Sequence, residues 1–461
     1  MFEFVIGRDK LLEKIEDLVE RKRYAELRGL LLPLEAADIA DIFEDLQEHE
    51  IPLVFRLLPK EQAAEVFVEL DSDEQELLIQ GFSNTELKEV LDELYLDDTV
   101  DIVEEMPANV VKRILMHSDP DVRKNINEIL KYPEDSAGSI MTTEFVDLKQ
   151  DMTVSDALKR IRRTGPDKET INVCYVIDVN RRLIGLLSIR TLLLAEEDDI
   201  IGDIMEQNFI SVRTLDDQEE VARSLSKYSF LALPVVDTEE RLVGIVTVDD
   251  AMDVLQEEVT EDIEKMAAIL PSDKPYLKTS TWETFKARIP WLLLLMISAT
   301  FTGQIISSFE SALAAATILT AYIPMLMDTG GNCGSQASVT VIRGISLSEI
   351  EFSDILRVIW KEIRVAVICG ITLAIANFVK LLLIDRMLFH NQMVTIPVAA
   401  VICCTMVCTV LCAKIVGCTL PLLAKKIGFD PAVMASPFIT TIVDAISLLI
   451  YFQFATAILG I

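Results

Sequence analysis

Residues 139–158, SIMTTEFVDLKQDMTVSDAL, and residues 203–222, DIMEQNFISVRTLDDQEEVA, are two copies of one pattern. The segments that follow them repeat as well: YVIDVNRRLIGLLSIRTLL at 175–193 is echoed by PVVDTEERLVGIVTVDDAM at 234–252. Each copy predicts a strand, a helix, a strand, a turn, a strand and a helix. Such self-similarity indicates a duplicated α/β unit in the middle of the chain.

The two copies, with Gly185 and Gly244 at equivalent positions, resemble a tandem pair of CBS domains. This resemblance implies a first CBS domain at 133–200 and a second at 201–255. It also implies that the pair senses a ligand and does not catalyse a reaction.

In CBS domains, Ser or Thr followed three residues later by Asp often contacts a nucleotide ribose. Thr247 and Asp250 match that motif, whereas the first copy has Ser188 with Thr191. The resemblance therefore implies ATP as one regulatory ligand, at the second copy alone.

Helices are predicted on both sides of the repeat. In residues 1–132, apolar residues recur three or four apart, as in AADIADIFEDLQ, which predicts an all-α superhelical domain. Residues 251–270 form a long acidic helix that ends at Pro271. We assign 256–279 to a connecting helix and linker between the soluble part and the rest of the chain.

Charge divides the chain into two halves. Residues 280–461 carry 11 Lys+Arg and 10 Asp+Glu, so 31 and 64 of the chain's 42 and 74 belong to residues 1–279. The acidic half repels nucleic acid and attracts cations. The N-terminus lacks the apolar run of a signal peptide, so we expect this half to stay in the cytosol.

The second half, residues 280–461, is predicted to be a transmembrane domain of five helices. Each candidate span is near the ~20 residues needed to cross a bilayer. The five spans are 290–309, 311–327, 363–384, 396–420 and 432–458.

Lys and Arg in the short loops predict the orientation. They precede the first span, separate the second from the third, and recur at Lys425 and Lys426 between the fourth and fifth. On the opposite side only Arg386 occurs, in the 385–395 loop. We therefore predict a multi-pass protein of a bacterial inner or plasma membrane, with a cytosolic N-terminus and an external C-terminus.

Asp444 stands out in the fifth span, in ASPFITTIVDAISLLIYF at 435–452. A charged group at mid-membrane costs at least about 2.5–3.5 kcal/mol, so a function is expected. Two interpretations remain open: Asp444 lines an aqueous path, or it pairs with Lys414 of the fourth span. A twofold axis would supply two such carboxylates, which suits Mg²⁺, an ion that keeps several of its waters.

The segment AYIPMLMDTGGNCGSQASVTVIRG at 321–344 is the second unusual stretch. Pro324 and the run Gly330, Gly331 and Asn332 are expected to interrupt a helix at membrane depth, which is tolerated where the backbone is buried or lines water. A cytosolic loop after the helix is the alternative.

These two segments, tandem CBS repeats and a helical N-terminal domain together resemble the MgtE family of magnesium channels over essentially the whole chain. The resemblance implies a homodimeric, Mg²⁺-selective uptake channel that is closed by cytosolic Mg²⁺, with Mg²⁺ as both substrate and regulator. It places the pore ion at Asp444, helped by backbone carbonyls near Thr440. It identifies the acidic helix at 251–270 with a plug helix beside the pore.

The resemblance also implies regulatory Mg²⁺ sites where the plug helix, the CBS pair and the N-terminal domain meet. The matching acids are Glu65, Asp97, Asp101, Asp217, Glu219, Asp250, Asp253, Glu258, Glu261, Asp262 and Asp430. Two positions depart from the expected pattern: Ser229 replaces an acid, and Asp328 places a carboxylate beside the glycines.

Other functions remain as alternatives. One is a transporter of broader range, for Co²⁺, Ni²⁺ or Mn²⁺, and another is a membrane-anchored CBS nucleotide sensor. Cys404, Cys408 and Cys412 share a helix face and could serve a soft metal, but small residues easing helix contact explain them as well. The chain has no P-loop, nucleophile elbow or HExxH motif, so no enzyme is predicted.

Overall fold

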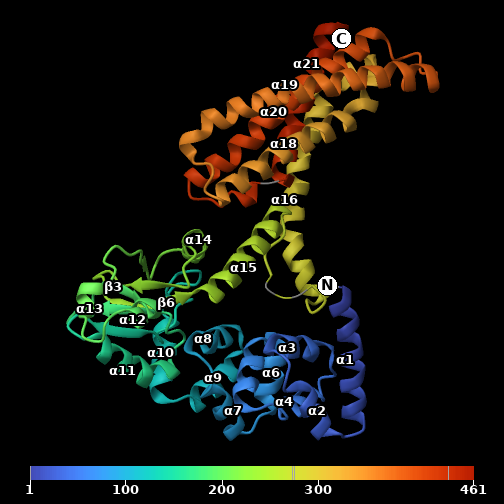
Figure 1. Cartoon of the computed structure of the whole chain (residues 1–461). Helices are drawn as coiled ribbons and strands as arrows, with labels where there is room; N and C mark the ends of the chain where they lie inside the picture. Colours follow the sequence, from blue (N-terminus) through green and yellow to red (C-terminus); the bar gives the residue numbers. More distant parts are fainter. Residues whose placement is uncertain (1, 273, 275, 435, 461) are drawn as a thin grey trace. The chain divides into compact units, whose positions relative to one another are not determined.

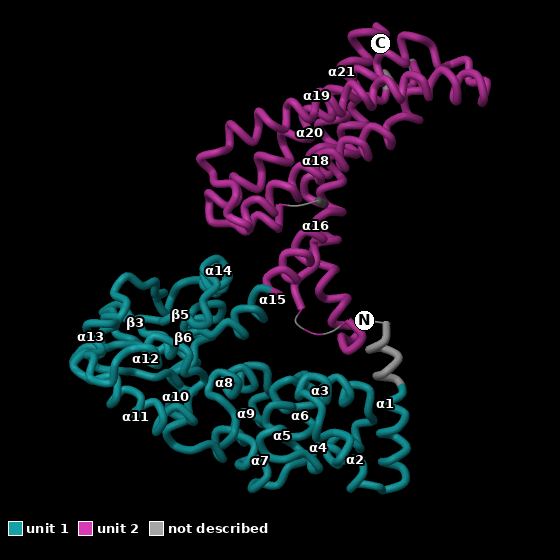
Figure 2. The backbone as a smooth tube through the Cα atoms, in the orientation of Figure 1, with its two compact units in different colours: residues 1–255 teal, residues 256–461 magenta. Residues whose placement is uncertain are grey.

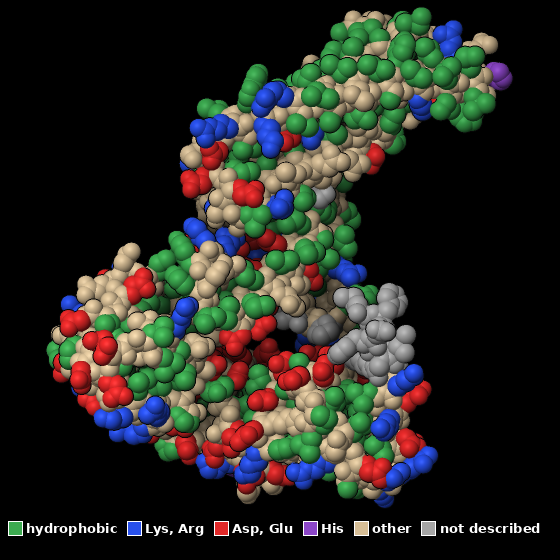
Figure 3. Space-filling model, viewed as in Figure 1, with side chains coloured by type: hydrophobic (Ala, Val, Ile, Leu, Met, Phe, Trp, Pro, Cys, Tyr) green, Lys and Arg blue, Asp and Glu red, His purple; other side chains and the backbone are tan. Residues whose placement is uncertain are grey.

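The computed structural model describes residues 2–272, 274, 276–434 and 436–460. The chain forms two compact units, Met1–Leu255 (unit 1) and Gln256–Ile461 (unit 2), which Figure 2 shows in different colours. Acidic side chains gather over unit 1 and hydrophobic ones over unit 2 (Figure 3). The boundary between the units precedes the charge division drawn at residue 279, so the acidic residues 256–279 belong to unit 2.

Unit 1 begins with helices that pack around one apolar core. Phe43, Phe55 and Phe67 lie buried in this core, and the rings of Phe55 and Phe67 meet edge to face with centroids 6.2 Å apart. The helices are α1 (Phe2–Glu20), α2 (Tyr24–Leu31), α3 (Ala36–Asp45), α4 (Ile51–Phe55), α5 (Lys60–Val68), α6 (Ser72–Gly81), α7 (Asn84–Leu91), α8 (Leu96–Glu105), α9 (Ala108–His117) and α10 (Pro120–Ile129). The predicted helices are present, while their superhelical stacking stays a prediction.

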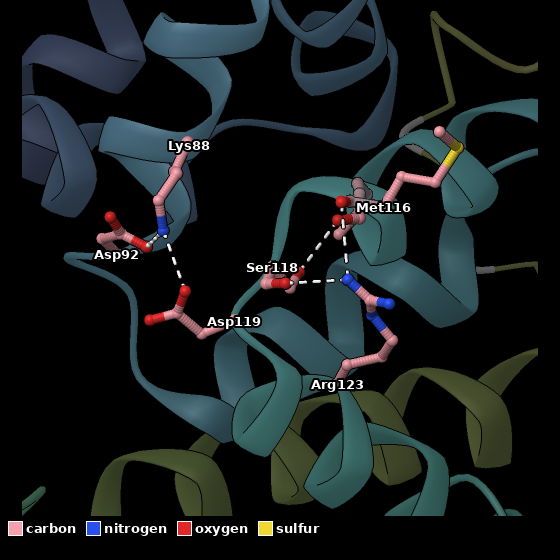
Figure 4. A network of polar contacts seen from close by, with 7 residues as sticks. Lys88, Asp92, Met116, Ser118, Asp119 and Arg123 are labelled. Atoms are coloured by element: carbon pink, nitrogen blue, oxygen red, sulfur yellow. Dashed lines mark hydrogen bonds and ion pairs between the residues drawn. The ribbon is translucent and has the colours of Figure 1, made fainter.

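A polar network joins α7 to the turn between α9 and α10 (Figure 4). Lys88 Nζ donates to Asp92 Oδ1 at 2.9 Å and to Asp119 Oδ1 at 3.0 Å. Arg123 Nη2 donates to the carbonyl of Ser118 at 3.0 Å. Exposed ion pairs contribute little stability, so this network mainly fixes the turn.

Two three-stranded sheets follow, one for each copy of the repeat (Figure 1). In both, the first strand runs parallel to the second and the third runs antiparallel to it. The strands are β1 (Val146–Lys149), β2 (Val173–Ile177), β3 (Leu183–Ser188), β4 (Val212–Arg213), β5 (Ala232–Val236) and β6 (Leu242–Thr247). The accompanying helices are α11 (Val154–Thr164), η1 (Gly165–Asp167), α12 (Ile189–Leu194), α13 (Ile201–Ile204) and α14 (Gln218–Tyr228).

The equivalent glycine of each copy packs against a methionine of the other copy. A Cβ on Gly185 would lie 2.6 Å from the sulfur of Met205, and a Cβ on Gly244 would lie 2.6 Å from the sulfur of Met141. Each methionine comes from the other copy of the repeat. Only glycine leaves room for this packing, which explains its presence in both copies.

Helix α15 (Val248–Met266) begins in unit 1 directly after β6 and continues into unit 2. The remaining elements of unit 2 are α16 (Thr281–Ser308), α17 (Glu310–Ala315), η2 (Thr317–Tyr322), α18 (Ile323–Ser346), η3 (Phe352–Asp354), α19 (Ile355–Lys380), the π-helix η4 (Leu381–Leu388), α20 (Ile396–Lys426), η5 (Ala432–Met434) and α21 (Ser436–Leu459).

Four helical segments of the described residues are long and apolar enough to cross a membrane, so five spans are not confirmed. These segments are Thr281–Ser308, Phe352–Leu388, Ile396–Lys426 and Ala432–Leu459. The predicted second span at 311–327 is divided among α17, η2 and the start of α18. Helix α18 is long enough to cross a bilayer, since an α-helix rises about 1.5 Å per residue. Its many polar residues lower its mean hydropathy, so it is not among these four segments.

The predicted interruption of the helix at Pro324, Gly330, Gly331 and Asn332 is wrong. Helix α18 runs unbroken from Ile323 to Ser346. Pro324 stands in the first turn, where its missing N–H has no helical acceptor to lose. The glycines permit close packing, because a Cβ on Gly331 would lie 2.9 Å from Thr440 Cγ2.

Candidate functional site

Carboxylates from α8 gather against carboxylates of the CBS repeat within unit 1. Asp97 is 6% exposed, and the neighbouring acids that act on it electrostatically are Asp250, Glu169 and Asp98. Desolvation and then these like charges raise the pKa of Asp97 well above its usual range. The structure therefore brings Asp97 and Asp250, which are 153 residues apart in sequence, into one acidic cluster.

The other members of the cluster are perturbed in the same direction. Desolvation, followed by repulsion from Asp250, raises the pKa of Asp98 to about 7 and that of Asp101 to about 8. Desolvation and then Asp98 raise the pKa of Glu169 to about 8. Glu169 and Asp98 were missed in the sequence, because no motif marks them and they meet the cluster only through folding.

Asp250 is also tied to the residue that shares its proposed nucleotide motif. The hydroxyl of Thr247 donates to the Asp250 carboxylate. Desolvation, only partly offset by this bond, raises the pKa of Asp250 to about 6. The Thr247–Asp250 pair therefore faces other acids.

Of the remaining acids predicted in unit 1, Asp253 acts electrostatically on Asp250 of the cluster, whereas Glu65, Asp217 and Glu219 are engaged elsewhere or exposed. Glu65 is exposed on α5. Asp217 caps α14 by accepting from the Glu219 N–H at 2.9 Å, and Glu219 pairs with Arg223. Asp253 lies one turn after Asp249 on α15. Desolvation, and to a smaller extent the charge of Asp249, raises the pKa of Asp253.

A second group of predicted acids meets in unit 2. Asp262, near the end of α15, accepts from the hydroxyl of Ser346 at 3.1 Å. Glu261 and Asp430 both contact Lys265, at 2.5 and 2.8 Å. Glu258 lies one turn earlier and is half-buried.

The contacts between α18 and α21 run in opposite directions along the two helices. A Cβ on Gly334 would lie 2.8 Å from Ile439 Cγ2, whereas a Cβ on Gly330 would lie 2.9 Å from the hydroxyl of Ser447. Moving toward the N-terminus of α18 therefore means moving toward the C-terminus of α21. The pair is antiparallel and closely packed.

This register places Asp328 at the level of Asp444. Gly331 of α18 meets Thr440 of α21. Asp328 lies about one turn before Gly331, and Asp444 lies one turn after Thr440, so both displacements follow the same direction. The two carboxylates interact electrostatically. Asp328 was noted in the sequence only as a departure from the expected pattern. In the structure it lies at the same level as Asp444 and interacts with it electrostatically.

Helix α18 presents a polar face beside these carboxylates. Asp328, Asn332 and Gln336 recur at four-residue spacing and are exposed, while Leu326 and Ala337 are buried on the other side. Polar side chains within a bilayer face water or protein and avoid lipid. Were α18 to cross the bilayer, its exposed face would require an aqueous path or a protein partner.

Lys414 pairs with a residue other than Asp444. Its Nζ lies 3.4 Å from Glu362 Oε2, and both side chains are buried between α19 and α20. Among the described residues Asp444 has no ion-pair partner. The alternative interpretation of Asp444 as half of a buried pair with Lys414 is therefore wrong.

The soft-metal alternative gains no support from the cysteines. Cys404 is exposed, while Cys408 and Cys412 are half-buried. Within the part of the chain that is described, no group of three or more His, Cys, Asp or Glu side chains is close enough to hold a metal ion. In the described residues the acidic clusters are therefore not preformed metal cages.

Without divalent cations, the local stability of α8 is expected to fall as pH rises from about 5 to about 8.5. Native pKa values of about 7 for Asp98 and about 8 for Asp101 and Glu169 exceed their unfolded values. The native cluster therefore binds more protons than the unfolded chain, and this stability is lost as pH passes the native pKa values. Hydrogen exchange of α8 in the full chain with chelator, corrected for the chemical exchange rate, measures it.

Peptides from α3 are the internal control, because α3 lies in the same unit and contributes no residue to the acidic cluster. Protection of α8 that stays level or increases with pH would contradict the electrostatic account.

Comparison with known families agrees with this organisation. The family model described as a divalent cation transporter matches residues 323–454, the MgtE intracellular N domain matches 34–135, and CBS domains match 137–198 and 201–257. The expectation of a cytosolic helical domain followed by a CBS pair is confirmed.

Full-length relatives point to the same family. The chain is 37% identical over 455 residues to a magnesium transporter MgtE of Thermus thermophilus, covering 98% of this chain and 99% of the relative. It is 33% identical to a magnesium transporter MgtE of Bacillus subtilis, covering 97% of both chains. A solved cytosolic domain of the Mg²⁺ channel MgtE in complex with ATP is 39% identical, with a TM-score of 0.50, and covers 53% of this chain and 99% of that chain.

These relatives are transporters, so the expectation that the chain is not an enzyme is confirmed. Membership implies a membrane protein that transports Mg²⁺. On the full-length similarity and the three matching family models, the chain belongs to the MgtE family of magnesium transporters.

Proposed function

We propose that the chain is a homodimeric Mg²⁺-selective channel for uptake, closed by cytosolic Mg²⁺ at its acidic clusters. One observation carries this proposal. The Asp444 carboxylate has no ion-pair partner among the described residues and stands beside the exposed polar face of α18. An unpaired carboxylate in an apolar helix is functional by default.

The polar face of α18 supports a pore formed between two copies. In a single chain this face is exposed, which is unfavourable against lipid. A second copy related by a twofold axis would cover it and bring two Asp444 carboxylates to one path. With α18 as a fifth crossing, the termini lie on opposite sides, as the loop charges predict, with the N-terminus in the cytosol.

The ligand chemistry favours a hydrated hard cation. Mg²⁺ is bound through one or two carboxylates and retains several waters, so a wide pore with few protein ligands suits it. Backbone carbonyls near Thr440 would contact those waters. Transport of Co²⁺, Ni²⁺ or Mn²⁺ is the second candidate, since oxygen ligands do not exclude these ions.

Closure follows from the like charges collected in unit 1. Asp97, Asp98 and Asp101 on α8 oppose Asp250 and Glu169 of the CBS pair. A divalent cation bound among these carboxylates neutralises their repulsion. It shifts the equilibrium toward the compact state to the extent that it binds this state more tightly than the open state. Because Asp250 lies in the first turn of α15, the state of the cluster can pass along one helix into unit 2.

We place no nucleotide at Thr247 and Asp250. A cytosolic domain of a related channel was solved in complex with ATP, which raises the question of nucleotide binding in this chain. Here, however, Asp250 interacts electrostatically with Asp97, Asp98 and Glu169. These carboxylates would repel a triphosphate. At this position we therefore propose regulation by Mg²⁺ and not by ATP.

A flux assay with the full chain in proteoliposomes tests the proposal. Chains whose cytosolic side faces Mg²⁺-free solution should carry Mg²⁺ down its gradient, and millimolar Mg²⁺ on that side should stop the flux. Parallel assays with Co²⁺, Ni²⁺ and Mn²⁺ decide between the two candidates. Flux that is absent, or indifferent to Mg²⁺ on both sides, contradicts the proposal.

Asp328→Asn is expected to raise the Mg²⁺ concentration for half-maximal flux about threefold to tenfold, because it removes one of two carboxylates at the same level of the path. The maximal flux should change less, since Asp444 remains. The matched control is Gln336→Ala on the same exposed face, which alters a polar side chain without altering charge. Equal effects of the two substitutions would exclude an electrostatic role for Asp328.

A further inference from the structure

The last turns of α15 are docked onto unit 2 by specific contacts. Asp262 Oδ2 accepts from the Ser346 hydroxyl at the end of α18, at 3.1 Å. Just after the helix, the Leu270 N–H donates to the carbonyl of Ala287 on α16, at 3.0 Å. The position of α15 in unit 2 is thus fixed by hydrogen bonds on both sides of Lys265.

Lys265 is the cation at the centre of these contacts. Its Nζ lies 2.5 Å from Glu261 Oε1 on the preceding turn and 2.8 Å from Asp430 Oδ2 in the segment between α20 and α21. Its side chain is 22% exposed. Desolvation opposes the charged form, but the hydrogen bonds to Asp430 and Glu261 outweigh it and raise the pKa of Lys265, so the side chain is a cation at neutral pH.

The carboxylates around Lys265 outnumber it. Asp262 interacts electrostatically with Glu261, Asp430 and Lys265, and the single ammonium group of Lys265 contacts both Glu261 and Asp430. Asp430 is further fixed because Oδ1 accepts from the Ala432 N–H at 2.8 Å. Three carboxylates and one ammonium leave an excess of two negative charges, which is the charge that one divalent cation would neutralise.

We propose that Lys265 is a tethered counter-ion that competes with Mg²⁺ for the Glu261 and Asp430 carboxylates and thereby sets the Mg²⁺ concentration at which α15 is held in place. The proposal rests on the proposed closure by cytosolic Mg²⁺. Mg²⁺ binds through carboxylate oxygens, and two of the oxygens available here are already engaged by Lys265. An ion that takes either of these two oxygens displaces the ammonium group from it, and an ion that binds the remaining oxygens is repelled by the ammonium charge nearby.

If Lys265 competes with Mg²⁺, removing its charge should lower the half-effective Mg²⁺ concentration. Lys265→Met frees both carboxylates and removes a positive charge from the path of the ion, so Mg²⁺ should bind more tightly. Since two partly exposed ion pairs are released, the half-effective Mg²⁺ concentration should fall about threefold to tenfold. Lys265→Arg keeps the charge and should stay within about twofold of the unsubstituted chain.

The experiment is hydrogen exchange of peptides covering 256–266 in the full chain in nanodiscs, titrated with Mg²⁺. The matched control is Lys286→Met, which removes the same charge from the exposed start of α16 in the same unit and should not shift the midpoint. The expected result is a lower midpoint for Lys265→Met alone. An unchanged or higher midpoint overturns the inference, and a higher one would make Lys265 a latch that helps Mg²⁺.

The outcome also separates this inference from the function on which it rests. If Mg²⁺ does not increase the protection of the unsubstituted chain, the proposed closure by Mg²⁺ is contradicted, whatever the variants show. If that chain responds and Lys265→Met titrates identically, closure stands and only the competition is wrong.

Discussion

Asp444→Asn is expected to abolish Mg²⁺ flux while leaving the protein folded. The substitution preserves the shape of the side chain and removes the charge that offsets the cost of placing a divalent cation in an apolar bundle. Among the described residues Asp444 has no ion-pair partner, so the loss of charge leaves no opposite charge unpaired. The flux assay should show at least a hundredfold reduction, about 2.7 kcal/mol of lost stabilisation.

The controls separate the pore from the scaffold. Glu310→Gln removes an exposed charge on α17 of the same unit and should retain flux. Lys414→Met should instead lower stability, because it leaves Glu362 as a buried unpaired charge. Size-exclusion chromatography and thermal unfolding of Asp444→Asn should match the unsubstituted chain. Flux that persists at a comparable rate would remove Asp444 from the pore.

The second large effect is expected from neutralising the acidic cluster of unit 1. The triple substitution Asp97→Asn, Asp101→Asn and Asp250→Asn removes both the carboxylate ligands and the repulsion between α8 and the CBS pair. The compact state should then form with or without Mg²⁺. Protease cleavage of unit 1, which should depend on Mg²⁺ in the unsubstituted chain, is expected to be slow under both conditions.

The matched control changes three exposed acids of unit 1 that lie outside the cluster, Glu61→Gln, Glu93→Gln and Asp121→Asn. It alters the net charge equally and should keep the difference between Mg²⁺ and chelator. A triple cluster variant that still responds like the unsubstituted chain would place regulation elsewhere. Rapid cleavage under both conditions would contradict repulsion as the opening force.

The sequence by itself determined the order of parts. Hydrophobic periodicity, the internal repeat and the charge division are local or short-range signals, so they predicted the helical domain, a duplicated α/β unit and an apolar helical region. The resemblance to CBS domains then identified the duplicated unit. The same local reasoning identified Asp444, because one carboxylate in an apolar helix is unusual whatever its neighbours are.

Local signals failed where helix packing decides. Gly330 and Gly331 read as breakers of a helix, yet they lie inside α18, since close contact with α20 and α21 requires small residues there. Lys414 was a plausible partner for Asp444 by depth alone, but the pairing depends on which helix faces it, and α19 supplies Glu362.

Only the tertiary structure decided which charges act together. Glu169 meets Asp98 and Lys265 meets Asp430 across long stretches of chain, and no spacing rule records either contact. The register of two antiparallel helices places Asp328 level with Asp444. Electrostatic interactions depend on distance in space, so the sequence suggested some of the carboxylates, whereas the fold determines which of them lie close enough to act on one another.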